Sequence, residues 1–299
     1  MTYSKRIAVT AAGGHLGTAI IKSLGSIAGS DEAADVVAVA RNPEAVELEG
    51  VEVRSGDYAD VAQMTEAFVG IDTVVLVSAP AGAGDRVQLH RNVIEAAITA
   101  GVRKVIYTSV IGNGDEMDTL YAPMAEVNRQ AEQDLQDSGL TWIAARNGLY
   151  LEFDVAHILN AGPDGIFRNN GGEGYCCYIT RTEIALATAV LAVRDHCDNR
   201  IVNIVGEAYR QDELIDIVNT QAGTSVSYEA VDDDSVLQKI SADRGDEVGR
   251  MLTGCYQAIR AGAFDVESDY EQILGMPCKP MQLMAAEVIA QCRAGNAER

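Results

Sequence analysis

The sequence predicts an α/β fold built on a doubly wound parallel sheet, with a smaller C-terminal α/β lobe. Short apolar runs alternate with helix-like segments through the first half of the chain. A glycine-rich turn joins the first apolar run to the first helix, and the regular alternation ends near residue 150. We therefore expect a sheet with helices on both faces and with ligands at the carboxyl ends of its strands.

The expected elements follow one another in a regular order. Strands are predicted at 7–10, 36–40, 51–54, 73–77, 104–108 and 141–145. Helices are predicted at 16–25, 61–69, 87–100 and 126–138, and glycines stand after the last two, where helices stop. Beyond residue 150 we expect a glycine- and asparagine-rich stretch (151–180), a strand at 201–205 that would extend the sheet, and helices at 182–193, 211–222 and around 233–260.

The most informative segment is the turn Thr10-Ala-Ala-Gly-Gly-His-Leu-Gly17, between the first strand and the first helix. It nearly matches T-G-x-x-G-x-x-G, whose glycines let a pyrophosphate approach a helix N-terminus and let the helix pack close to the strand. Ala11 replaces the first glycine, so it must take a negative φ or carry strain. This turn predicts a Rossmann-type NAD(P)-binding domain over residues 1–150. Residues 151–299 would form a smaller substrate-covering lobe, partly interleaved with the sheet.

The residues after the second strand indicate which dinucleotide binds. An acid there would hold the ribose hydroxyls of NAD, but Arg41-Asn42-Pro43 follows instead. Because a guanidinium can pair bidentately with a 2′-phosphate, we expect NADP(H), with a surface arginine as the alternative reading. Two further strand ends supply candidates. Asp57 and Tyr58 would lie near the adenine, and Ser78, Ala79 and Pro80 near the nicotinamide ribose.

The composition narrows the range of partners. A formal net charge of −21 argues against general affinity for nucleic acid or anionic membranes. No apolar run approaches the roughly 18 residues of a membrane span, and no secretory signal is recognisable. We therefore expect a cytoplasmic protein with reduced cysteines. The scattered cysteines and histidines predict no metal site, and the sequence leaves a monomer and a homodimer open.

Several segments together resemble the NmrA-like atypical short-chain dehydrogenases, most of all the bacterial NAD(P)H:quinone oxidoreductases and triphenylmethane reductases. The likeness covers about residues 5–220 well. It rests on Thr10–Gly17, Arg41–Pro43, Gly56–Tyr58, His90–Ala97, Ala100–Ser109, Arg146–Tyr150 and Thr180–Ala185.

The resemblance implies a cleft that holds NADPH and gives each part of the cofactor its residues. The pyrophosphate would lie along Ala11, Ala12, Gly13, Gly14, His15 and Leu16. The nicotinamide and a small-molecule acceptor would face Asn147, Gly148 and Tyr150. Arg181 is a weaker match to a residue of the cofactor region.

The sequence departs from its relatives at the catalytic position. None of the 11 tyrosines is followed by lysine four residues later, so the Tyr-x-x-x-Lys pair of ordinary short-chain dehydrogenases is absent. Asn128 aligns with a lysine or histidine of related reductases, yet an asparagine cannot act as a general acid near neutral pH. Tyr150 and Tyr121 remain candidate donors, with a packing role as the alternative for each. His157, in an expected lid, has substrate contact and a structural role both open.

Three functions remain in competition. The leading one is an NADPH-dependent reductase of a small electrophilic, aromatic acceptor such as a quinone, because such an acceptor takes up hydride when proximity alone aligns it. The second is a non-catalytic NADP(H) sensor that regulates a partner. The third is an isoflavone- or lignan-type reductase, which the missing lysine disfavours.

Overall fold

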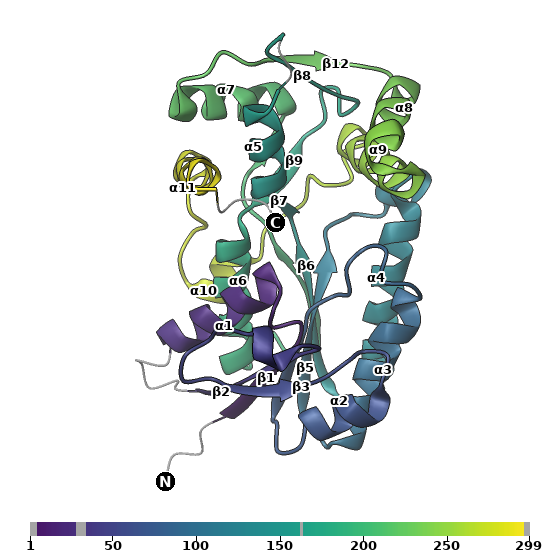
Figure 1. Ribbon diagram of the computed structural model, residues 1–299, viewed down its shortest axis with the longest axis vertical. Coiled ribbons are helices and arrows are strands. Elements are labelled where there is room, and N and C mark those ends of the chain that lie inside the picture. The colour runs from purple at the N-terminus through teal and green to yellow at the C-terminus, as the bar shows by residue number, and fades with distance from the viewer. Residues whose placement is uncertain (1–4, 28–33, 162–163, 296–299) are drawn as a thin grey trace.

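A seven-stranded parallel sheet forms the centre of the computed structural model, which describes residues 5–27, 34–161 and 164–295 (Figure 1). The strand order is β10-β6-β5-β4-β1-β2-β3. From β1 the next two strands extend the sheet to one side, and from β4 onward strands are added on the other side, so the order of the strands reverses between β1 and β4. The strands are β1 (Lys5–Val9), β2 (Ala34–Ala40), β3 (Glu52–Ser55), β4 (Thr73–Leu76), β5 (Lys104–Val110), β6 (Thr141–Asn147) and β10 (Arg200–Ile204). The predicted doubly wound α/β fold is confirmed, and the strand expected at 201–205 does extend the sheet.

Helices cover both faces of this sheet. Three lie on one face: α2 (Val61–Ala67), α3 (Arg86–Thr99) and α4 (Ala122–Gln136). On the other face α1 (His15–Ile27) packs against α6 (Arg181–Val193). Side chains alternate along β1 as a strand requires, with Ile7 and Val9 in the core under α1 and α6 and Ala8 in the core under α2 to α4. Burial on both faces explains why the strands read as continuous apolar runs.

The remaining elements form the smaller C-terminal α/β region. Its helices are α5 (Leu151–Leu159), α7 (Gln211–Ala222), α8 (Asp233–Arg244), α9 (Asp246–Arg260), α10 (Tyr270–Leu274) and α11 (Met281–Arg293). Its short strands are β7 (Leu149–Tyr150), β8 (Ile166–Asn169), β9 (Cys176–Ile179), β11 (Ala208–Tyr209) and β12 (Ser227–Ala230). Two 3-10 turns, η1 (Pro43–Ala45) and η2 (Asp115–Asp118), complete the elements. Figure 1 places α5, α7, α8 and α9 at the end of the molecule toward which β6 leads.

A buried carboxylate ties four elements of this region together. Asp154 of α5 accepts hydrogen bonds from the hydroxyls of Tyr178 on β9 (2.6 Å) and Tyr256 on α9 (2.8 Å). Gln211 at the start of α7 donates to the Tyr178 hydroxyl (2.6 Å). Since a buried polar group is costly unless it is paired, this network fixes α5 relative to its neighbours.

Three segments differ in detail from the sequence expectations. The helix expected at 126–138 begins at Ala122, because Pro123 lies in the first turn, where its missing N–H costs nothing. The stretch around 233–260 is two helices, separated at Gly245 with a φ of +90°. The glycine-rich stretch 151–180 contains α5, whose residues carry no glycine at all. Among the described residues, no helix is long and apolar enough to cross a membrane.

Candidate cofactor and acceptor site

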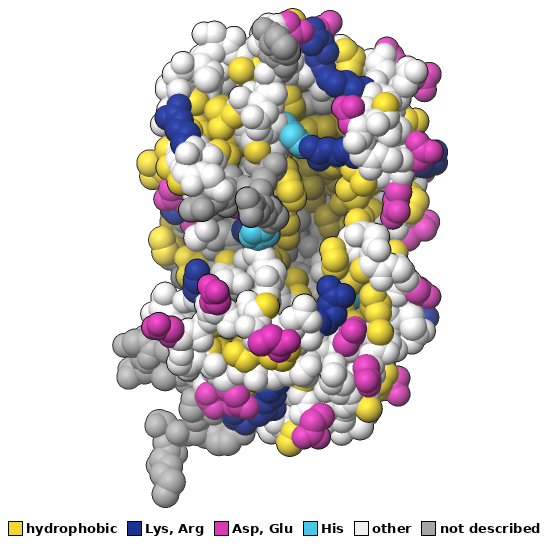
Figure 2. All heavy atoms as spheres, in the orientation of Figure 1, with side chains coloured by type: hydrophobic (Ala, Val, Ile, Leu, Met, Phe, Trp, Pro, Cys, Tyr) yellow, Lys and Arg dark blue, Asp and Glu magenta, His cyan; other side chains and the backbone are white. Residues whose placement is uncertain are grey.

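A groove of about 710 Å³ follows the carboxyl ends of β1, β2, β3 and β4, and Figure 2 shows the hollowed face of the molecule. Of the predicted cofactor residues, those that line it are Ala11, Gly13, Gly14, His15, Leu16, Arg41, Asp57, Tyr58, Ser78, Ala79 and Pro80. Asn42, already noted after the second strand, also lines the groove. Further lining residues that no sequence signal indicated include Ala45, Ala83 and Leu89. Because the strand order reverses between β1 and β4, the groove lies at the switch point where doubly wound folds bind ligands.

The turn after β1 presses closely on the first helix. A Cβ at Gly17 would lie 2.4 Å from the Ala11 carbonyl oxygen, so only glycine fits there. Ala11 has a φ of +50°, which realises the strained alternative expected for an alanine at this position. Ala12 is fully buried beneath the turn, and its carbonyl accepts from the Thr18 hydroxyl (2.8 Å). The first-turn N–H groups of α1 have no partner inside the helix, and no acidic residue lies in that turn.

Tyr58 ties the loop after β3 to the end of β4. Its hydroxyl donates to the Val77 carbonyl (2.7 Å) and contacts the Thr10 hydroxyl, whose oxygen accepts from the Val77 N–H (3.0 Å). Burial raises the pKa of Tyr58 well above its usual value, so this phenol stays protonated. Tyr58 therefore holds three strand ends in register and offers its ring to the groove. Asp57 beside it accepts from the Ala59 N–H (3.0 Å).

Arg41 forms the cationic end of the groove. It directly follows β2, its side chain is exposed, and within the described ranges no carboxylate pairs with its guanidinium. Asn42 and Pro43 lead from it into η1, and the Asn42 side chain makes no capping hydrogen bond there. A guanidinium without a carboxylate partner keeps its full charge and its five donors for an anion.

The loop after β4 is held from below by two buried side chains that the sequence analysis did not single out. His90 Nε2 accepts from the Ala79 N–H (2.9 Å), and Arg86 Nε donates to the Ala79 carbonyl (2.8 Å). Burial, followed by the charge of Arg86, lowers the pKa of His90 to about 3, which keeps the imidazole neutral and able to accept. The Ser78 N–H donates to the Thr108 hydroxyl (2.9 Å). The segment 78–80 therefore has a fixed backbone.

The predicted nicotinamide and acceptor residues lie at the end of β6 and beyond it. Asn147 is buried, and no described group donates to its Oδ1. Gly148 packs under β9, since a Cβ there would lie 2.6 Å from the Cys177 carbonyl oxygen. Tyr150 is partly exposed and stacks on Phe153 with ring centroids 5.9 Å apart. Burial raises the pKa of Tyr150 to about 12.

The other catalytic candidates are occupied elsewhere. The Asn128 amide is buried, accepts from the Tyr107 hydroxyl (2.7 Å) and donates to the Met124 carbonyl (2.8 Å). Tyr121 is buried edge-on against Phe264, which matches its packing alternative. His157 belongs to helix α5, so the expected lid is a helix at this residue. The described residues thus place no dedicated acid at the position that Asn128 was aligned to.

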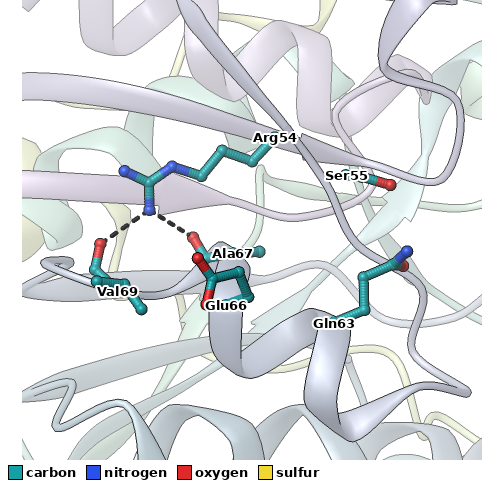
Figure 3. A pocket seen from close by; sticks show the side chains of 6 residues that line it. All are labelled: Arg54, Ser55, Gln63, Glu66, Ala67 and Val69. Carbon is teal, nitrogen blue, oxygen red and sulfur yellow. Dashed lines mark hydrogen bonds between the residues drawn. The ribbon is translucent and has the colours of Figure 1, made fainter.

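A second hollow, of about 470 Å³, lies between β3 and α2 (Figure 3). Arg54 reaches across it, and its Nη1 donates to the carbonyls of Ala67 and Val69 (both 2.8 Å). Its Nε donates to Glu52 (2.7 Å). These bonds satisfy the carbonyls that the end of α2 leaves free, so the arginine stabilises the helix end.

In the part of the chain that the structure describes, no cluster of histidine, cysteine and acidic side chains could hold a metal ion. None of the six cysteines forms a disulfide with another described residue.

Ala11→Gly should stabilise the protein by about 1 kcal/mol, because it removes the cost of a left-handed alanine and outweighs the extra freedom of the unfolded chain. Urea unfolding without nucleotide measures the change. Ala12→Gly is the matched control and should lower stability, since Ala12 is buried and its φ is not positive. A loss of stability in Ala11→Gly would contradict the strain at this turn.

His90 should make folding sensitive to acid. The unfolded imidazole takes up a proton near pH 6.5 and the buried one only near 3, so stability falls as the pH drops through this window. From about pH 7 to about pH 5 the wild type should lose about 2 kcal/mol more than His90→Gln, which keeps an acceptor for the Ala79 N–H. Urea unfolding at both pH values tests this, and equal losses would refute it.

Comparison with known proteins agrees with this geometry. An NAD(P)H-binding family model matches residues 11–187. Quinone oxidoreductase 2 of Escherichia coli is 31% identical over 91% of this chain and 94% of its own length. An NmrA-like family domain-containing oxidoreductase of Aspergillus flavus is 30% identical over 82% and 80%.

A solved structure shares the fold over nearly the whole chain. The triphenylmethane reductase of Citrobacter sp., crystallised with NADP(H), superposes with a TM-score of 0.83 at 28% identity, covering 95% of this chain and 99% of its own. The expected resemblance is confirmed, and the chain belongs to the NmrA-like family of NAD(P)H-binding proteins.

Proposed function

We propose that this protein is an NADPH-dependent reductase that transfers a hydride to a small electrophilic, aromatic acceptor such as a quinone. The observation that carries the proposal is the groove itself. It joins the N-terminus of α1, whose first turn holds no acidic residue, to an arginine without a carboxylate partner among the described residues. Two anionic groups of one ligand would each find a favourable field there. The reductase names of the relatives support the same conclusion.

The residues present fit the dinucleotide. The first-turn N–H groups of α1 would hold the pyrophosphate, and Gly17 lets the helix approach close enough to the strand to offer them. Arg41 would bind the 2′-phosphate. The Ser78–Pro80 backbone, fixed by His90, would support the nicotinamide ribose, and the free Asn147 Oδ1 is an acceptor for a ligand N–H. When bound, the reduced nicotinamide supplies two electrons and a proton as a hydride.

The preference for a quinone-like acceptor follows from the asparagine that stands where related reductases carry a lysine or histidine. Reduction of a simple ketone builds an alkoxide and benefits from a positioned proton donor. The side-chain amide of Asn128 is engaged in hydrogen bonds with Tyr107 and Met124, and burial raises the pKa of the Tyr150 phenol. A quinone is already electrophilic, and water can protonate its stabilised product. Binding the two reactants face to face then supplies much of the catalysis.

One observation favours the sensor as the second candidate. The polar group at the catalytic position, Asn128, takes part in packing α4 on β5 instead of facing the groove. A protein that only reads NADP(H) needs the groove and no donor. The two candidates therefore differ in turnover and agree in nucleotide binding.

Turnover with a panel of quinones decides between them. NADPH consumption, followed by its absorbance, should rise with at least one quinone above the rate without acceptor. Isothermal calorimetry on the same preparation should show NADPH binding. Binding without turnover on any quinone would favour the sensor, and no binding of either pyridine nucleotide would refute both candidates.

Arg41→Ala should weaken NADPH binding far more than NADH binding. A charge-assisted bond to phosphate contributes about 1.5–3 kcal/mol, so KM for NADPH should rise about 10- to 100-fold while KM for NADH changes little. NADH is the matched control because it lacks only the 2′-phosphate. Equal rises for both cofactors would show that Arg41 does not select NADPH.

A further inference from the structure

A cation lies across two aromatic rings just beyond the predicted nicotinamide end of the groove. The guanidinium carbon of Arg181 is 5.0 Å from the centre of the Tyr150 ring and 4.8 Å from that of Phe153. The two rings stack, and Phe153 is 46% exposed although it is fully apolar. A cation over two ring faces, next to an exposed aromatic, forms a platform of the kind that binds flat aromatic molecules.

The platform lies next to the cofactor groove. Glu152 lies between Tyr150 and Phe153 in the sequence. Its carboxyl accepts a hydrogen bond from the backbone N–H of Arg181 at the start of α6 (2.9 Å). His15, which lines the groove, lies close enough to Glu152 for the two side chains to interact electrostatically. Tyr150 also follows β6 closely, at the same sheet edge as Ser78 to Pro80. Arg181, Tyr150 and Phe153 therefore stand where an acceptor could meet the reduced nicotinamide.

The positive charge of Arg181 is not neutralised by its surroundings. No carboxylate of the described residues forms an ion pair with its guanidinium, and its side chain makes no hydrogen bond to them. The carboxyl group of Glu152, next to Tyr150 and Phe153, is buried with Oε2 unpartnered, and it meets Arg181 through the backbone N–H and not through the guanidinium. The Arg181 guanidinium thus keeps both its charge and its donors for a ligand.

We propose that Arg181 is a catalytic residue that binds the acceptor oxygen on which negative charge develops, while Phe153 and Tyr150 support the acceptor ring. The inference rests on the proposed function. A quinone gains a hydride, two electrons and one proton, from the reduced dinucleotide and becomes a hydroquinone monoanion; a proton from water completes the hydroquinone. A guanidinium at the anionic oxygen stabilises this charge as it forms. A positively charged triphenylmethane dye becomes neutral when it accepts a hydride. No negative charge develops on it, so a guanidinium does not stabilise its reduction.

The test compares Arg181→Met, Arg181→Lys and the control Arg200→Met on menadione and malachite green. Arg200 is exposed at the amino end of β10, the opposite edge of the sheet from the site. We expect Arg181→Met to lower kcat on menadione about 100-fold, Arg181→Lys to lose less, and Arg200→Met to change nothing. On malachite green, Arg181→Met should be no slower than the wild type. Calorimetry should give all four proteins the same affinity for NADPH.

Other outcomes overturn the inference. A loss on menadione matched by an equal loss on malachite green would mean a structural role for Arg181. A weaker affinity for NADPH in Arg181→Met that Arg181→Lys restores would assign Arg181 to the cofactor. If the wild type reduces neither malachite green nor menadione nor any other quinone, the proposed function itself is refuted. If the wild type is active but substitution of Arg181 leaves kcat unchanged, only the role of Arg181 is refuted.

Discussion

The structure depends on the close contact between the turn after β1 and the start of α1. Gly17 lies so near the Ala11 carbonyl that a methyl group would not fit. This contact brings the N-terminus of α1, with the positive end of its helix dipole, to the carboxyl ends of the strands beside the groove. The neighbouring strand ends are then aligned to it by Tyr58 and Thr10. Without this close approach, the N-terminus of α1 would move away from the strand ends that line the rest of the groove.

Much of the fold was predictable because its signals are local. Buried parallel strands need continuous apolar runs, and the runs from Ile7 to Ala145 mark the six strands that the sequence predicted. Strand ends in such a sheet converge, so Arg41 and Ser78 could be assigned to one groove without coordinates. Helix α5 escaped because its polar network with Tyr178 and Tyr256 depends on partners far along the chain. Packing over such distances leaves no periodic signal.

The site was less predictable for the same reason. The sequence indicated His90 only as part of a segment that resembles the family. Its role depends on its burial beside Arg86 and on the hydrogen bond that it accepts from the Ala79 N–H. The side-chain chemistry of Asn128 alone predicts a poor acid, yet its bond to Tyr107 on β5 could be seen only in the packed structure. Residues whose chemistry depends on an edge of the sheet are readable from sequence. Residues whose chemistry depends on a neighbour across the core are not.

The asparagine at position 128, where related reductases carry a lysine or histidine, changes what the rest of the site must provide. A proton donor stabilises developing charge by neutralising it, whereas a fixed cation stabilises the same charge without transferring a proton. The two strategies favour different acceptors: the first suits ketones whose alkoxides are strong bases, and the second suits acceptors whose reduced anions are already delocalised. With Asn128 committed to the core and Arg181 held over Tyr150 and Phe153, this chain has the parts for the second strategy. The same charge would repel a cationic acceptor, so one guanidinium can set both rate and specificity.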